Sequence, residues 1–199
     1  MKLAAMILGA GRSRRMGRPK LLLPWAGTTV LGHLLKVWRG LEAEPICVVV
    51  AADDHVLSTE LDRLGVPQAH RILNPSPETG MFGSVQCAAG WAVGFRSPIT
   101  HIALILGDQP HLKVDSLSGL LRFSEAHLHQ VCQPSYRGHK RHPVIVPRCC
   151  FEELAGSSAQ TLKEFLADCD IGILPCDDPG LDLDLDTPLD YQKLLLLQG

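Results

Sequence analysis

An apolar run near the start of the chain, ending abruptly in glycine, limits the possible folds more than any other feature. Residues Leu3 to Leu8 are all apolar, and Gly9-Ala10-Gly11 follow directly. Because apolar residues fill both faces of this run, it predicts a strand inside a sheet that helices cover on both sides. Glycine after such a strand lets backbone N–H groups approach a ligand, since no Cβ stands in the way.

Five cations follow the glycines within nine positions: Arg12, Arg14, Arg15, Arg18 and Lys20. Cationic side chains beside exposed N–H donors are typical of a site for a polyanion, most simply a triphosphate. A solvated basic loop beside a tight turn is the alternative interpretation. Basic loops seldom place two glycines at the carboxyl end of a buried strand, so we favour the polyanion site.

Two well-known phosphate-binding loops do not fit this segment. A P-loop needs Gly-x-x-x-x-Gly-Lys, but Gly11 and Gly17 bracket five residues and Arg18 stands where the lysine belongs. The dinucleotide fingerprint needs a third glycine where Arg14 stands. It also needs an acid about 20 residues further on, and the first acid after the loop is Glu42.

Strand and helix patterns alternate along the whole chain. We expect strands at 3–8, 46–51, 70–73, 101–106, 130–134 and 142–146. We expect helices at 28–39, 55–64, 80–95, 113–127, 160–167 and 188–197. Pro19 and Pro24 should keep the loop after the first strand outside regular structure until about Thr28. The alternation predicts a single domain, residues 1–199, with a three-layer α/β/α, Rossmann-like fold and a mostly parallel sheet.

Carboxylates are expected at the same edge of the sheet as the glycine loop. Ligands of open parallel sheets lie beyond the carboxyl ends of the strands, which places 9–20, 74–84 and 107–110 around one cleft. Asp108 follows a buried strand there, and beside a triphosphate its carboxylate can hold Mg²⁺. The alternative is a structural aspartate in a turn.

A second carboxylate should come from the acidic segment LDLDLDTPLDY near the end of the chain. Alternation puts three aspartates on one face of an extended segment and three leucines on the other: Asp182, Asp184 and Asp186, with Leu181, Leu183 and Leu185. The alternative is an acidic edge exposed to water. Thr187 and Pro188 directly after Asp186, with Asp190 three residues past Thr187, predict a capped helix start.

The first loop resembles the signature of the MobA-like nucleotidyltransferases, and the resemblance covers nearly the whole chain. Arg15-Met16-Gly17 and Lys20 match that signature, whereas Gly9 stands where the family more often has Ala. Three further segments match in order, NPSPETGMFGS, GDQP and the HPV that begins at His142. Within the family, the chain most resembles the molybdenum cofactor cytidylyltransferases.

The resemblance implies roles for individual residues. The triphosphate would contact Leu8, Gly9, Ala10 and Gly11 together with Arg15 and Lys20, and the catalytic residues would be Arg15, Lys20 and Asp108. Asp108 and Asp186 would hold Mg²⁺, and Asp184 is the alternative to Asp186 as the second metal ligand. The segment that holds Asn74, Gly80 and Ser84 would select the nucleotide. The family's pterin would bind near His142, although Lys140-Arg141 replaces the usual Arg-Gly before it.

The implied reaction is transfer of CMP from CTP to the phosphate of molybdopterin, with release of pyrophosphate. A phosphate monoester has a second pKa of about 6, so this nucleophile is ionised at neutral pH and needs no general base. GTP in place of CTP, a sugar 1-phosphate as acceptor, and a nucleotide-binding protein without catalysis remain open. A molybdoenzyme or its chaperone is the expected protein partner.

Composition excludes several other classes of function. A net charge of −2 with no extended basic face argues against a nucleic-acid partner. No apolar stretch is long enough to span a bilayer. The chain runs straight from Met1 into the presumed phosphate loop, so we expect no signal peptide and a cytoplasmic location. Seven cysteines without a Cys-x-x-Cys pair are expected to be free thiols.

Overall fold

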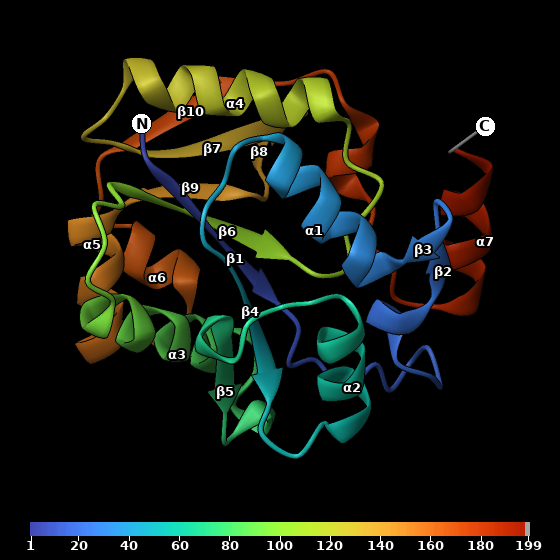
Figure 1. Cartoon of the computed structure of the whole chain (residues 1–199). Helices are drawn as coiled ribbons and strands as arrows, with labels where there is room; N and C mark the ends of the chain where they lie inside the picture. Colours follow the sequence, from blue (N-terminus) through green and yellow to red (C-terminus); the bar gives the residue numbers. More distant parts are fainter. Residues whose placement is uncertain (198–199) are drawn as a thin grey trace.

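Strands and helices alternate along the chain in the computed structural model, which describes residues 1–197 (Figure 1). The strands are β1 Leu3–Leu8, β2 Pro24–Trp25, β3 Thr28–Thr29, β4 Ile46–Ala51, β5 Arg71–Asn74, β6 His101–Leu106, β7 Val131–Tyr136, β8 His139–Lys140, β9 Val144–Pro147 and β10 Ile171–Pro175. The helices are α1 Val30–Gly40, α2 His55–Arg63, α3 Met81–Gly94, α4 Val114–Ala126, α5 Arg148–Glu153, α6 Leu162–Leu166 and α7 Pro188–Leu196. Within residues 1–197, no helix combines the length and the apolar character that crossing a membrane requires.

The main sheet is mixed and mostly parallel, as predicted. Its strand order is β10-β7-β9-β6-β1-β4-β5, and β8 pairs with β7. The four strands β6, β1, β4 and β5 run parallel, as do β7 and β10. Among residues 1–197, only β9 and the short β8 pair antiparallel within this sheet, β9 with β6 and β7, and β8 with β7. The carboxyl ends of β1, β4, β5 and β6 therefore lie along one edge.

Helices cover both faces of the sheet, and alternate side chains of β1 pack against the helices on opposite faces. Leu3, Ala5 and Ile7 pack in one cluster with buried residues of α1, α2, α4 and α7. Ala4 and Met6 point to the opposite face, into a cluster with α3, α5 and α6. Because apolar side chains cover both faces of the strand, β1 is buried almost throughout. The three-layer α/β/α arrangement predicted from the sequence is confirmed (Figure 1).

Local structure differs from the sequence prediction after β1. Residues 9–19 form neither helix nor strand, as predicted, but Lys20–Leu22 form a 3₁₀ turn and β2 pairs with β3 in a hairpin. Leu21, Leu23 and Trp25 are buried there, so their packing fixes this segment against the core. The prediction also missed β10 and α5.

Candidate active site

Three loops converge at the carboxyl edge of the sheet around a pocket of about 230 Å³. The loop after β1 contributes Gly9 to Gly11 and Lys20, and the loop after β6 contributes Asp108. The segment between β5 and α3 contributes Gly80, and the first turn of α3 contributes Ser84. The structure therefore brings together the three segments that the strand-end rule places around one cleft.

Lys20 lies at the centre of the charged groups. Its Nζ is 2.6 Å from Asp108 Oδ2 and 3.4 Å from Asp186 Oδ1. Arg15 reaches the same group from outside, with its guanidinium 2.7 Å from Asp186 Oδ2. The side chains of Lys20, Asp108 and Asp186 are only 17%, 21% and 26% exposed, so water screens these charges less than at the surface.

Local packing holds Lys20 and Asp186 in place. Ser13 has a positive φ of 48°, and its hydroxyl accepts a hydrogen bond from the Lys20 amide at 3.1 Å. On the other side, the amide of the buried Leu185 donates to the Asp108 carbonyl at 2.9 Å. The capping box at Thr187 then begins α7 directly after Asp186. The segment before α7 is thus tied to the loop after β6, whereas the hydrogen bond to Ser13 holds Lys20 within its own loop.

The carboxylates fit the requirements of a magnesium ion. Asp108 Oδ1 is buried and has no hydrogen-bond partner among residues 1–197, although its other oxygen is paired with Lys20. Carboxylate oxygens are the ligands that Mg²⁺ prefers, and it commonly uses one or two of them together with substrate phosphates. No group of three His, Cys, Asp or Glu side chains in the described part of the chain could hold a metal by itself.

The three aspartates near the end of the chain do not share one role. Asp182 pairs with Arg141, and Asp184 accepts a hydrogen bond from Gln109 Nε2 at 3.0 Å. Burial, followed by the nearby Asp108, raises the pKa of Asp184. The predicted continuous alternation is wrong, because Pro179–Asp182 form a 3₁₀ turn and Leu183 is 38% exposed.

Gly9 is required by packing as much as by ligand access. A Cβ on Gly9 would lie 2.9 Å from Leu21 Cδ1 and 3.0 Å from the Val49 carbonyl oxygen. The Gly9 amide donates to that same oxygen at 2.8 Å. This corrects the prediction that the amide is free for a phosphate. Among residues 1–197, the amides of Ala10 and Gly11 have no such acceptor, and both residues line the pocket.

Asn74 orders the loop that precedes α3. It is 1% exposed, donates from Nδ2 to Ser84 Oγ at 3.0 Å, and accepts from the Ser76 amide at 2.9 Å. Ser84 and Gly80, which has a φ of 86°, line the pocket, whereas Asn74 does not. The sequence predicts that Asn74 helps to select the nucleotide but does not reveal its hydrogen bond to Ser84. That hydrogen bond makes Asn74 a residue that positions Ser84.

His142 lies beside the site in a neighbouring pocket, which Lys140 and Arg141 also line. Its Nδ1 is 3.5 Å from the Leu104 carbonyl oxygen, and burial lowers the pKa of its imidazole. The sequence prediction that His142 lies near a second ligand stays a prediction at this stage.

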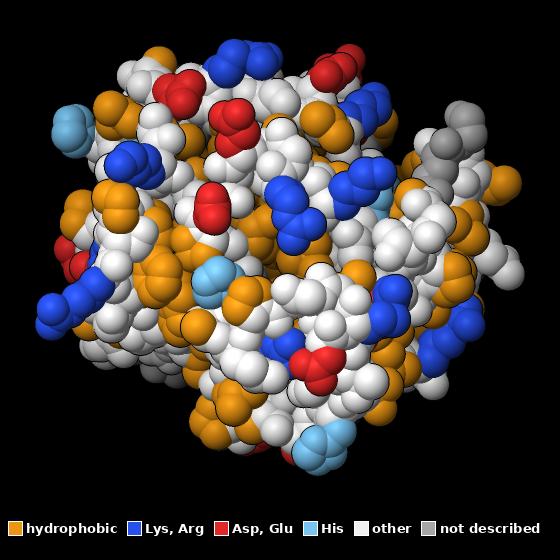
Figure 2. Space-filling view, viewed as in Figure 1, with side chains coloured by type: hydrophobic (Ala, Val, Ile, Leu, Met, Phe, Trp, Pro, Cys, Tyr) orange, Lys and Arg blue, Asp and Glu red, His pale blue; other side chains and the backbone are white. Residues whose placement is uncertain are grey.

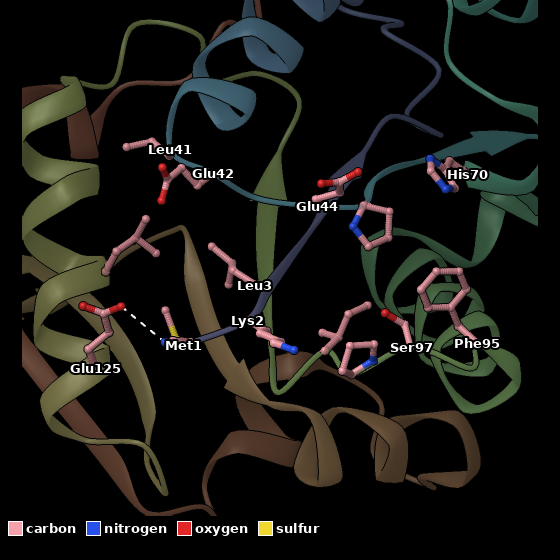
Figure 3. A pocket seen from close by; sticks show the side chains of 14 residues that line it. Met1, Lys2, Leu3, Leu41, Glu42, Glu44, His70, Phe95, Ser97 and Glu125 are labelled. Carbon is pink, nitrogen blue, oxygen red and sulfur yellow. Dashed lines mark hydrogen bonds and ion pairs between the residues drawn. The ribbon is translucent and has the colours of Figure 1, made fainter.

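A different pocket, of about 520 Å³, lies at the opposite end of the strands (Figure 3). It is lined by residues before or at the starts of β1, β4 and β6, and Glu125 reaches across to the amino group of Met1 at 3.4 Å. None of the sequence-predicted site residues lines it. On the face shown in Figure 2, cationic and anionic side chains are intermixed rather than gathered by sign.

Comparison with known proteins identifies related sequences. The family model of the MobA-like NTP transferase domain matches residues 5–171. The molybdenum cofactor cytidylyltransferase of Escherichia coli K12 is 26% identical over 94% of this chain and 92% of its own length. A probable molybdenum cofactor guanylyltransferase of Mycobacterium ulcerans is 34% identical, but over 61% of this chain and 56% of its own.

Solved structures share the fold. Rv0371c from Mycobacterium tuberculosis H37Rv superimposes with a TM-score of 0.76 at 25% identity, covering 98% of both chains. A structure of that protein in complex with manganese gives a TM-score of 0.69 at 24% identity over 98% of this chain and 99% of the other.

Proposed function

Because this chain belongs to the MobA-like NTP transferase family and is a nucleotidyltransferase, we propose that it transfers CMP from CTP to the phosphate of molybdopterin and releases pyrophosphate. The observation that carries the proposal is the convergence of Asp108 and Asp186 on the Lys20 ammonium, beside the glycine loop. Cations, amides and carboxylates at one pocket are the parts that a metal-bound triphosphate requires. The reacting unit would be a single domain in the cytoplasm.

The residues of the chain act by positioning and by neutralising charge. The Ala10 and Gly11 amides, with Lys20 and Arg15, would hold the phosphates of CTP. Asp108 and Asp186 would hold Mg²⁺, which when bound withdraws charge from phosphate oxygens. The acceptor phosphate is already ionised at neutral pH, so no side chain has to remove a proton from it. Fixed positive groups around the leaving pyrophosphate then lower the barrier without rearranging during the reaction.

CTP is the proposed nucleotide rather than GTP. Gly80-Met81 resembles the cytidylyl branch, and the E. coli cytidylyltransferase matches nearly the whole chain, whereas the guanylyltransferase matches 61% of it. GTP is the second candidate, because the guanylyltransferase has the higher identity where it aligns. Mg²⁺ is the proposed metal, supported by the oxygen ligands and by the manganese complex of a structural relative. A molybdoenzyme or its chaperone is the proposed recipient of the product.

A screen of the four nucleoside triphosphates with molybdopterin and Mg²⁺ tests the proposal by its pyrophosphate release. We expect release with CTP well above that with the other three. Pyrophosphate release with GTP alone would identify GTP as the nucleotide substrate. Release only when glucose 1-phosphate replaces molybdopterin would identify a sugar phosphate as the acceptor. Tight CTP binding without release under any of these conditions would identify a nucleotide-binding protein without catalysis.

A further inference from the structure

Two cysteines from different elements are in contact beside α6. Cys150 belongs to α5, and Cys169 lies between the end of α6 and the start of β10. Their sulfur atoms are 3.6 Å apart, and both side chains are half-buried. Among residues 1–197, no other pair of cysteine thiols is in hydrogen-bonding contact, and all seven cysteines are free. The structure thus sets this pair apart from the other five thiols.

The elements that carry the two cysteines are held to different degrees. α5 and α6 cover the same face of the sheet (Figure 1). In α5, the guanidinium of Arg148 donates to three carbonyl oxygens at and beyond the end of α3, at distances of 2.7 to 3.1 Å. α6 has only five residues, and its buried side chains are Leu162 and Leu166, which also line the pocket beside His142. A covalent bond to α5 would therefore fix one wall of that pocket.

We propose that Cys150 and Cys169 form a reversible disulfide when the protein meets hydrogen peroxide, and that this bond holds α6 against α5. The sulfur atoms of a disulfide are about 2.0 Å apart, so the two have to approach each other by about 1.5 Å. An approach of this size is within reach of rotation about the two Cα–Cβ bonds. The proposal is independent of the proposed nucleotidyl transfer.

Hydrogen peroxide is the oxidant, and Cys169 is the thiol that reacts first. Burial, followed by the neighbouring Cys169 thiol, raises the pKa of the Cys150 thiol to about 12, so Cys150 keeps its proton at neutral pH and is a poor nucleophile. The Cys169 thiolate attacks one oxygen of the peroxide, hydroxide leaves, and a sulfenic acid forms. The Cys150 sulfur then displaces the sulfenic hydroxyl, which leaves as water with the Cys150 proton.

Contact between the two sulfur atoms favours this second step over further oxidation, because both groups belong to one molecule and already lie together. A dithiol reverses the bond by thiol–disulfide exchange. Disulfides that form in a reducing compartment are usually transient and sense the redox state, which fits a bond made from two thiols that are free in the resting protein.

Peptide mapping of the peroxide-treated protein tests the proposal. Trypsin cleaves after Arg148 and Lys163, which places the two cysteines in separate peptides, 149–163 and 164–193. After free thiols have been blocked, a digest of the oxidised wild type without reductant should contain these two peptides linked to each other. Treatment with dithiothreitol before digestion should separate them.

Each peptide also contains a second cysteine, and these supply matched controls. Cys149 is exposed and directly precedes Cys150, and Cys176 shares the other peptide with Cys169. Cys149→Ala and Cys176→Ala should keep the link, whereas Cys150→Ala and Cys169→Ala should lose it. The wild type and the two controls decide the question even where a substitution at Cys150 or Cys169 alters folding.

Hydrogen exchange measures the hold on α6. Exchange of the amides of residues 162–167 should slow at least about fivefold in the oxidised wild type relative to the reduced protein. Equal exchange in the two forms overturns the hold on α6. Loss of the link in Cys149→Ala or Cys176→Ala, a link between two chains, or oxidation of the thiols to sulfinic acid without a link overturns the disulfide. Neither measurement needs a nucleotide, so failure here is distinct from failure of the proposed function.

Discussion

At the level of single residues, Lys20 keeps two carboxylates close together. Asp108 and Asp186 repel each other, and the Lys20 ammonium lies within 2.6 Å of one and 3.4 Å of the other. We predict that Lys20→Ala lowers kcat at least about a hundredfold in a pyrophosphate-release assay, the effect of losing one preorganised charge-stabilising group. Lys36→Ala, an exposed lysine outside the site, should be unaffected. Turnover of Lys20→Ala at the wild-type rate would remove Lys20 from the mechanism.

Asp108 is the carboxylate whose loss should affect the metal most directly. Its Oδ1 is buried and lacks a partner within residues 1–197, which leaves it free to bind a cation. We predict that Asp108→Ala lowers turnover at least about a hundredfold at saturating Mg²⁺, and that EDTA abolishes wild-type release until Mg²⁺ is restored. Asp115→Ala, on the exposed side of α4, is the control. Wild-type turnover of Asp108→Ala in Mg²⁺ would contradict its role as a ligand.

Close packing requires a glycine at position 107, whereas at position 11 there is room for a larger side chain. A Cβ on Gly107 would lie 2.8 Å from the Leu8 carbonyl oxygen and 2.9 Å from Leu21 Cδ2, whereas a Cβ on Gly11 would meet no atom of residues 1–197 within 4 Å. We predict that Gly107→Ala lowers the free energy of unfolding by about 1–3 kcal/mol, because backbone has to shift. Gly11→Ala should change stability by less than about 1 kcal/mol. Urea unfolding of both variants measures the difference, and equal stability would refute the close approach.

At the level of elements, the start of α7 links stability to the site. Thr187 accepts from the Asp190 amide at 3.2 Å, and Asp190 accepts from the Thr187 amide at 3.0 Å. We predict that Thr187→Ala costs about 1 kcal/mol of unfolding free energy and raises the Mg²⁺ concentration needed for half-maximal activity, since Asp186 directly precedes the cap. Thr161→Ala removes the cap of α6 and should affect stability without the change in Mg²⁺ requirement. An unchanged Mg²⁺ requirement in Thr187→Ala would show that the helix cap does not position the Asp186 carboxylate.

Elements with a strong local signal are predictable from the sequence, and elements defined by pairing are not. The apolar run Leu3–Leu8 and the Thr187-Pro188 start of α7 have the predicted bounds to within a residue. By contrast, the direction of β9 depends on its partners β6 and β7, which no local pattern specifies. Ile171–Pro175 was missed because five residues with a glycine give no clear period of two.

At the level of the whole molecule, topology explains which parts of the site the sequence could predict. Lys20 and Asp108 follow neighbouring parallel strands, so the strand-end rule suffices to bring them together. The Arg141–Asp182 ion pair joins the segment after β8 to a 3₁₀ turn, and the pocket beside His142 joins the same segment to α6. Such contacts depend on how loops fold over the sheet edge. Residue spacing carries no information about them.

The distribution of buried histidines predicts how the stability of the whole protein depends on pH. Burial lowers the pKa of four imidazoles: His33, His101, His111 and His142. Below pH of about 6.5 the unfolded chain takes up protons that these folded-state imidazoles resist, so the free energy of unfolding should fall as pH decreases from 7 toward 5. The carboxyls with lowered pKa values, Asp53, Glu60 and Asp190, add to this loss only nearer pH 4.

Urea unfolding at half-unit steps between pH 8 and pH 5 measures this dependence. His101 is a suitable residue to replace, because its ring nitrogens lie 3.0 Å from Thr100 Oγ1 and 3.0 Å from the Leu128 carbonyl oxygen, far along the sheet from the carboxylates. His101→Gln should be less stable than wild type at pH 8 but should lose less stability on acidification. The reason is that glutamine takes up no proton in the unfolded chain, whereas histidine does. The raised pKa of Asp184, caused first by burial, makes the folded protein bind a proton more readily and so stabilises it as the pH falls. We expect the four imidazoles together to outweigh this single carboxyl. Stability that is constant or rises from pH 7 to pH 5 would show that these imidazoles gain protons as readily in the folded protein as in the unfolded chain.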